Sequence, residues 1–123
     1  MARVLVADDE PAERDVLARG LIARGHQVAT AADGAEALVA LAAARYDLLI
    51  ADIVMPVMDG IALALMATSS HPDLKIVLVT GYAAELARAR NLEALAQRVV
   101  SKPYAIADIA RLADELVGPP GAA

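Results

Sequence analysis

The 123-residue chain has no cysteine, no tryptophan and no phenylalanine. Because it lacks cysteine, it can form neither a disulfide framework nor a thiolate metal site, and we expect it in a reducing compartment, the cytoplasm. Its net charge is -5 at pH 7, and only Lys75 and Lys102 among its 11 basic residues are lysines. Nucleic-acid binding would need a basic face or stacking aromatic side chains, so the composition argues against a nucleic-acid partner.

Long apolar runs are missing too, although 59% of the residues are hydrophobic. A membrane-spanning helix needs roughly 18 consecutive apolar residues. The longest uncharged stretch before the C-terminal tail, residues 60–72, contains Ser69 and His71. The chain also turns acidic at Asp8, too early for a secretory signal. We therefore expect no membrane contact and a single domain with an ordinary core.

What the sequence does contain is a short apolar run, Leu48 to Ala51, that ends in Asp52. The run is too short for a helix and suits a strand buried on both faces, as in a parallel sheet covered by helices. Pro56 and Gly60 mark the residues after it as a turn. Asp52 is therefore expected at the carboxyl end of a strand, where the functional groups of open α/β sheets gather.

Segments that predict a strand alternate with segments that predict a helix along the whole chain. The expected strands are residues 3–7, 27–31, 48–52, 75–80 and 98–101. The expected helices run from Pro11 to Gly25, from the capping box at Asp33 to Glu36 onward, over 60–69, over 83–96 and from Ile106 to Leu116.

Because strand–helix–strand connections in parallel sheets are right-handed, this order predicts an α/β domain with a doubly wound five-stranded parallel sheet. The strand order 2-1-3-4-5 is adopted from known flavodoxin-like (βα)5 folds, for which it is the common arrangement. We expect the domain to span residues 1–117 and residues 118–123 to form a flexible tail.

This order brings polar side chains from four strands to one edge of the sheet. Asp8 and Asp9 follow the first strand, Asp52 ends the third, Thr80 ends the fourth and Lys102 follows the fifth. Carboxylates about 4 Å apart repel by roughly 4 kcal/mol at an effective dielectric of about 20, and a hard cation such as Mg²⁺ would remove that repulsion. The alternative is that the acidic residues after the first strand only cap the following helix.

Thr80 and Lys102 supply what an acylphosphate on Asp52 would need, namely a hydroxyl donor and a cation for the phosphoryl oxygens. Phosphoryl transfer depends mostly on positioning and charge neutralisation, which a metal, a lysine and a hydroxyl can provide. No glycine-rich nucleotide loop follows the first strand. His26 and His71 are expected at the surface rather than in a catalytic set.

These motifs resemble those of the response-regulator receiver domain of two-component signalling, a CheY-like family. The resemblance covers the chain from about Arg3 to Val117. The motifs that carry it are Asp8-Asp9, Asp52 with the following residues to Asp59-Gly60, Thr80-Gly81 and Lys102-Pro103. It implies that Asp52 accepts a phosphoryl group from a histidine kinase or a histidine phosphotransferase.

By the same resemblance, the domain would bind Mg²⁺. The ligands would be Asp9, Asp52 and the backbone carbonyl of Val54, with Asp8 acting largely through water. The family's Lys–Pro peptide is commonly cis, so the Lys102–Pro103 peptide is expected to be cis.

The resemblance further implies a switch rather than an enzyme. The domain would assist its own phosphotransfer and dephosphorylation, with Thr80 and Lys102 on the phosphoryl oxygens. Phosphorylation would change partner binding on the face made by the fourth helix, the fifth strand and the fifth helix. Receivers usually carry Tyr or Phe three residues before the lysine, where this chain has Val99. We therefore hypothesise that Tyr82 or Tyr104 passes the change onward.

The start at Met1 and the short tail favour a single-domain signalling protein, and stretches such as 79–84 and 101–104 are similar to the CpdR-type single-domain receivers. That narrower resemblance implies an output partner in a protease adaptor system. The alternatives are a receiver fragment of a hybrid histidine kinase or of a DNA-binding regulator, and a degenerate receiver that only binds. An aspartyl-phosphate phosphatase is a further alternative, but such enzymes carry a second Asp two residues after the nucleophile, and this chain has Val54 at that position.

Overall fold

Parallel strands form one sheet in the computed structural model, which describes residues 2–90 and 98–118 of the chain. The strands are β1 (Arg3–Ala7), β2 (Gln27–Ala31), β3 (Leu48–Asp52), β4 (Lys75–Thr80) and β5 (Arg98–Ser101). Their order across the sheet is β2-β1-β3-β4-β5, and each neighbouring pair is parallel. The predicted flavodoxin-like, doubly wound arrangement is therefore confirmed.

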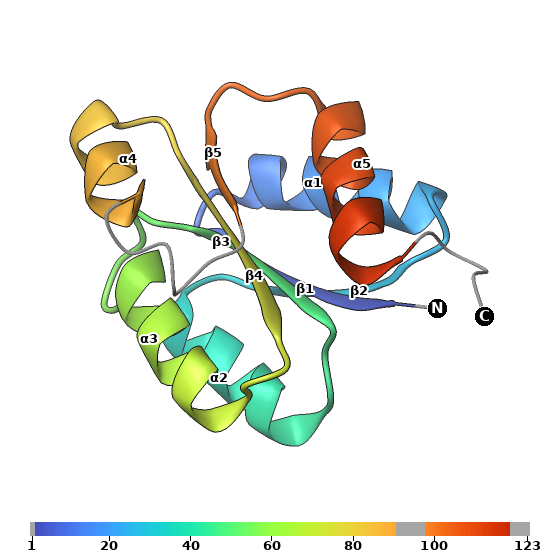
Figure 1. Cartoon of the computed structure of the whole chain (residues 1–123), viewed down its shortest axis with the longest axis horizontal. Coiled ribbons are helices and arrows are strands. Elements are labelled where there is room, and N and C mark those ends of the chain that lie inside the picture. The colour runs from blue at the N-terminus through green and yellow to red at the C-terminus, as the bar shows by residue number, and fades with distance from the viewer. Residues whose placement is uncertain (1, 91–97, 119–123) are drawn as a thin grey trace.

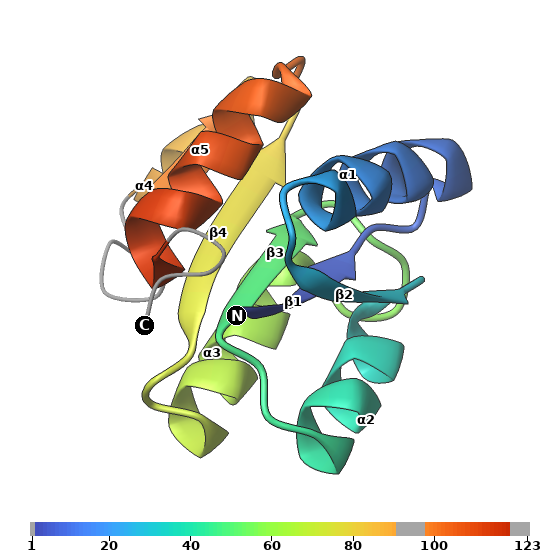
Figure 2. The same cartoon turned by 90° about the vertical axis from the view of Figure 1, so that its right-hand side faces the viewer.

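Helices cover both faces of this sheet. They are α1 (Pro11–Ala23), α2 (Gly34–Ala43), α3 (Gly60–Ser70), α4 (Ala83–Arg90) and α5 (Ile106–Val117). In Figures 1 and 2, α1 and α5 lie on one side of the sheet, and α2 and α3 lie on the other. No helix within the described ranges is long and apolar enough to cross a membrane.

Two sequence predictions fall partly outside the described residues. The helix predicted over 83–96 is described as far as Arg90, and residues 91–97 are not described. Of the predicted tail, 118–123, only Gly118 is described.

The apolar run of β3 is buried along its whole length because successive side chains point to opposite faces of the sheet. Leu49 and Ala51 join the core under α2 and α3, which also includes Ala89 of α4. Leu48 and Ile50 join the core under α1 and α5. The same alternation in β1 and β4 gives the sheet two apolar faces, which is why its central strands read as continuous hydrophobic runs.

Side chains that precede three of the helices cap them. Glu10 caps α1, Asp33 caps α2 by accepting a hydrogen bond from the N–H of Glu36 at 2.8 Å, and Asp59 caps α3 by accepting one from Ala62 at 2.8 Å. Such caps satisfy backbone donors that the first helical turn leaves free. The capping interpretation of the acidic residues after β1 therefore holds for Glu10.

The turn between β3 and α3 brings the start of the helix against the end of the strand. Val57 has a φ of 70°, and the N–H of Met58 donates to the carbonyl of Pro56 at 2.8 Å. The chain then returns so closely that a Cβ atom on Gly60 would lie 2.4 Å from the carbonyl oxygen of Asp52. Only glycine fits there without a shift of the backbone.

His26 was predicted at the surface, and this prediction is wrong. Its side chain is 0% exposed, and Nε2 lies 3.1 Å from Oδ1 of Asp114 on α5. A carboxylate can only accept, so Nε2 donates this hydrogen bond. Arg24 also binds Asp114. The partner lies 88 residues away in the sequence, so no local pattern around His26 indicates it.

The Asp114 carboxylate thus ties the turn after α1 to α5, and we expect Asp114→Asn to destabilise the protein. The loss at pH 7 should be about 1–3 kcal/mol, because two charge-assisted hydrogen bonds are weakened. Burial opposes ionisation of Asp114, but the hydrogen bonds from Arg24 and His26 outweigh it and lower the pKa of the carboxyl below 3.8. Urea denaturation at a series of pH values measures the effect.

The sign of the pH dependence follows from this lowered pKa. The stabilisation by Asp114 should be complete above the pKa of the unfolded chain, about 3.9, and should disappear as the pH falls through the lower pKa of the folded protein. The control is Asp108→Asn, which removes an exposed ion pair with Arg111 and should cost about 0–1 kcal/mol. Equal losses in the two variants, or a loss that does not shrink as the pH falls below about 3.9, would contradict the prediction.

Candidate functional site

The carboxyl ends of neighbouring strands bring the predicted site residues to one edge of the sheet. Asp52 and Thr80 are the last residues of β3 and β4, and Asp8 and Lys102 directly follow β1 and β5. The Lys102–Pro103 peptide is cis, as expected. Four residues from widely separated parts of the sequence therefore meet where the strand order predicts.

Asp52 is buried, with 7% of its surface exposed. Its Oδ2 accepts a hydrogen bond from Nζ of Lys102 at 2.9 Å, and its Oδ1 accepts one from the N–H of Val54 at 3.3 Å. A buried carboxylate without such partners would be costly. The contact with Lys102 therefore stabilises Asp52 at this edge.

Three carboxylates surround the ammonium group of Lys102. Nζ lies 2.8 Å from Glu13, 2.9 Å from Asp52 and 3.6 Å from Asp8. Burial disfavours the charged form, but the hydrogen bonds to Glu13 and Asp52 and the charge of Asp8 outweigh it and raise the pKa of Lys102 above its ordinary value. Lys102 is therefore cationic throughout the physiological pH range.

Asp8 is buried, and its Oδ1 accepts a hydrogen bond from the N–H of Glu10 at 2.9 Å. Burial raises the pKa of Asp8, although the Glu10 hydrogen bond and the charge of Lys102 act in the opposite direction. Asp8, Glu13 and Asp52 each offer an oxygen that lies within 4.8 Å of the others. The edge is thus a cluster of carboxylates around a single ammonium group.

Asp9 lies next to this cluster and, unlike Asp8, is exposed. It lines an open cavity of about 470 Å³ together with Asp52, Val54, Tyr82 and Lys102. The cavity therefore brings together three of the predicted metal ligands, Asp9, Asp52 and Val54, whereas Asp8 does not line it. The tight group of carboxylates nevertheless contains Glu13 instead of Asp9.

Thr80 is 1% exposed, and its Oγ1 accepts a hydrogen bond from the N–H of Tyr82 at 3.2 Å. Its O–H can still donate to another group. The ring of Tyr82 is largely exposed.

Tyr104 is half-buried. Burial raises the pKa of its hydroxyl, although the charge of Lys102 acts to lower that pKa. Val99, in place of the aromatic residue usual in receivers, packs against the core under α2 and α3.

Glu13 is the site residue that sequence reasoning missed. It lies on α1, and its Oε2 accepts a hydrogen bond from Lys102. The available signal was its spacing from Asp9, because residues four apart share one face of a helix. That signal was weak, since Asp9 precedes the helix and an acidic residue in a first helical turn usually interacts with the helix dipole.

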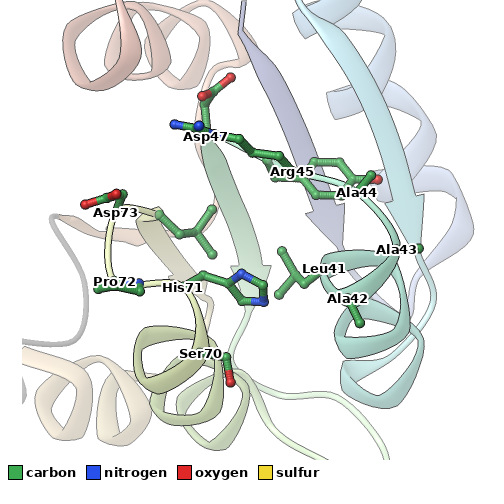
Figure 3. A pocket seen from close by; sticks show the side chains of 12 residues that line it. Leu41, Ala42, Ala43, Ala44, Arg45, Asp47, Ser70, His71, Pro72 and Asp73 are labelled. Atoms are coloured by element: carbon green, nitrogen blue, oxygen red, sulfur yellow. The ribbon is translucent and has the colours of Figure 1, made fainter.

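A second cavity, of about 450 Å³, lies at the opposite edge of the sheet (Figure 3). Asp47 and Leu74, which line it, immediately precede β3 and β4. The imidazole of His71 points into it, between Leu41 and Pro72 (Figure 3). None of the site residues predicted from the sequence lines this cavity, so the candidate chemistry belongs to the carboxyl edge.

The donor atoms at the carboxyl edge suit a hard cation. The closely grouped ligands are carboxylate oxygens, which Mg²⁺ prefers, and Mg²⁺ is typically bound by one or two carboxylates. The cluster also holds more carboxylates than ammonium groups. A divalent cation would therefore offset a repulsion that Lys102 alone compensates incompletely.

Comparison with known proteins gives one consistent family. Residues 4–114 match the model of the response regulator receiver domain. The chain is 39% identical over 109 residues to the response regulator receiver protein CpdR of Brucella abortus, covering 89% of this chain and 91% of that protein. It is 40% identical to the sensor kinase CckA of the same organism, but it spans only 12% of that protein's length.

Solved structures agree with this assignment. The response regulator TrrA of Thermotoga maritima, solved in complex with Mg²⁺ and BeF, has a TM-score of 0.85 and 34% identity, covering 94% of this chain and 99% of that one. A CheY-like receiver domain protein of Methanospirillum hungatei has a TM-score of 0.87 and 30% identity over 94% and 92% of the two chains. The chain therefore belongs to the response regulator receiver domains of two-component systems.

Proposed function

We propose that Asp52 accepts a phosphoryl group from a histidine kinase or a histidine phosphotransferase. The observation that carries the proposal is the contact of 2.9 Å between Asp52 and Lys102 at the shared strand edge. In the transfer, the P–N bond of a phosphohistidine breaks and a P–O bond forms to a carboxylate oxygen of Asp52. The imidazole nitrogen keeps the bonding electron pair and takes up a proton.

Lys102 and Thr80 would bind the oxygens of the transferred group. The raised pKa of Lys102 keeps it charged, so it can offset the growing negative charge. The hydroxyl of Thr80 can donate to another phosphoryl oxygen. The same groups would assist hydrolysis of the acylphosphate, which returns Asp52 to its free form. In this role the protein is a switch that assists its own chemistry rather than an enzyme that turns over a separate substrate.

Asp8, Asp9, Asp52 and the backbone carbonyl of Val54 would hold Mg²⁺. Asp9, Asp52 and Val54 line one cavity, and Asp8 contributes a buried carboxylate beside it. When bound, the ion neutralises charge on the phosphoryl oxygens. The TrrA structure was solved with Mg²⁺ and a beryllium fluoride group, which supports the same chemistry here.

The proposed receiver unit is residues 1–117, with 118–123 as a flexible tail, and its proposed location is the cytoplasm.

Phosphorylation would change partner binding on the face formed by α4, β5 and α5, with Tyr82 or Tyr104 passing the change from Thr80. The N–H of Tyr82 already donates to Thr80, which favours the first route. The similarity to the response regulator receiver protein CpdR favours the single-domain form, and the output partner that we propose belongs to a protease adaptor system. The similarity to CckA keeps open a receiver segment of a hybrid kinase.

The test is to incubate the wild-type protein with a small phosphodonor and to weigh the intact chain. We expect one phosphoryl adduct with Mg²⁺ and much less after EDTA is added. In parallel, release of phosphate from an aryl phosphate monoester is measured. Steady turnover of that ester without a stable adduct would favour a phosphatase, and no adduct under any condition would favour a degenerate receiver that only binds.

A further inference from the structure

Glu13 differs from the other residues around Lys102 because it approaches the ammonium group from α1. Its side chain is 51% exposed, compared with 19% for Lys102 and 10% for Asp52. Its Oε2 nevertheless lies 2.8 Å from Nζ, as close as the Asp52 oxygen at 2.9 Å. Glu13 and Asp52 therefore share the same cation.

An ammonium group has three N–H donors. Glu13 and Asp52 each accept one hydrogen bond, and Asp8 faces the group at 3.6 Å. The ammonium group therefore donates to two carboxylates and lies close to a third. If Lys102 leaves Asp52, Glu13 can retain it as a partner, so the lysine does not become an unpaired partly buried charge.

This arrangement affects a cation that enters beside Asp52. Lys102 and the incoming cation compete for the Asp52 oxygens, and Glu13 gives Lys102 an alternative partner. The charge of Glu13 also makes the cluster more negative. The alternative partner for Lys102 and the added negative charge both strengthen the binding of a divalent cation.

The effect on a phosphoryl group is the opposite. The group adds negative charge at Asp52, close to the carboxylate of Glu13, which repels it. Lys102 must also bind the phosphoryl oxygens while Glu13 draws it toward α1. Both effects disfavour the phosphorylated form.

We propose that Glu13 is a positioning residue that gives Lys102 a second partner on α1 when Lys102 leaves Asp52, and thereby promotes Mg²⁺ binding and opposes retention of the phosphoryl group. The inference rests on the proposed function of Asp52. It assigns Glu13 the role of setting the balance between the metal-bound resting form and the phosphorylated form.

The test compares wild type with Glu13→Gln, which keeps the size of the side chain and removes its charge. Mg²⁺ affinity is measured by calorimetry or by amide chemical shifts. Affinity for beryllofluoride, a non-covalent substitute for the phosphoryl group, is measured at Mg²⁺ concentrations that saturate each variant. We expect Mg²⁺ to bind roughly three- to tenfold more weakly and beryllofluoride roughly three- to tenfold more tightly, as expected for one partly exposed charge near the site.

Asp15→Asn is the matched control. Asp15 lies on the same helix and pairs with Arg19 at 3.1 Å, with both side chains largely exposed. The substitution changes the net charge by the same amount as Glu13→Gln. We expect it to leave both affinities within a factor of two of wild type.

The opposite direction of the two shifts is the decisive result, because general damage to the site would weaken both ligands. Unchanged affinities in Glu13→Gln, or a loss of both, would overturn the role of Glu13. If the wild-type protein itself binds no beryllofluoride at saturating Mg²⁺, the proposed function of Asp52 fails, and this outcome is distinct from a failure of Glu13→Gln alone.

Discussion

Replacing Asp52 by alanine is expected to abolish the phosphoryl adduct completely, whatever the concentration of Mg²⁺ or of the small phosphodonor. Asp52 is the carboxylate that Lys102 contacts at the end of β3, and phosphoryl transfer depends on positioning and charge neutralisation around the acceptor oxygen. Intact-mass spectrometry of both proteins under identical conditions measures the result.

The neighbouring carboxylates are poor substitutes for Asp52. Oδ1 of Asp8 already accepts a hydrogen bond from Glu10. Glu13 is half-exposed on α1, where water competes for the Lys102 contact that would offset the transferred charge. We therefore expect no residual adduct on either residue.

The variant should remain folded, which makes the result interpretable. Asp52→Ala removes one negative charge from a cluster of carboxylates, and Lys102 keeps Glu13 as a partner at 2.8 Å. Asp73→Ala, which removes an exposed carboxylate at the opposite edge, is the control and should give the same adduct as wild type. Any phosphoryl adduct on Asp52→Ala would contradict the prediction, and one of undiminished yield would show that another residue is the acceptor.

Gly60→Ala is expected to destabilise the protein by about 2–3 kcal/mol, a typical cost of overpacking. Its Cβ would lie 2.4 Å from the carbonyl oxygen of Asp52 and 2.9 Å from Cα of Ile53. Both contacts are with the backbone, which cannot rotate away as a flexible side chain can. Urea denaturation measures the loss, and we also expect amide shifts at Asp52.

Gly81→Ala is the matched control at the same edge of the sheet. A Cβ there would meet Cβ of Lys102 at 3.7 Å, an ordinary van der Waals contact. Alanine also restricts the unfolded chain more than glycine does, a gain of about 0.4–1 kcal/mol where the backbone conformation suits it. We expect no loss of stability in Gly81→Ala. If the two variants lose equal stability, the steric argument is wrong.

Those parts of the fold that depend on local sequence patterns could be predicted from the sequence. The run from Leu48 to Ala51 is apolar at every position because both faces of β3 are covered. Asp33 and its spacing to Glu36 mark the start of α2 through a hydrogen bond that spans three residues. Such signals lie within one turn or one strand, so they can be read without coordinates.

The contacts that sequence reasoning missed, one in the site and one elsewhere in the fold, join distant segments. Glu13 and Lys102 are 89 residues apart, and His26 and Asp114 are 88 residues apart. Neither residue type nor spacing indicates these pairs. The convergence of Asp8, Asp52 and Lys102 could be anticipated because strand order fixes which ends are neighbours, whereas strand order does not specify which side chains of α1 reach the edge.

The covering of both sheet faces by helices has a consequence for how such a domain can diversify. The groups proposed for the chemistry project from one edge, and among the helical residues only Glu13, in the first turn of α1, is assigned a role there. The remaining helix surfaces can change their charge and shape to suit unrelated partners while the proposed acceptor edge keeps its geometry. The one reaction proposed for this edge could in this way be connected to different output partners.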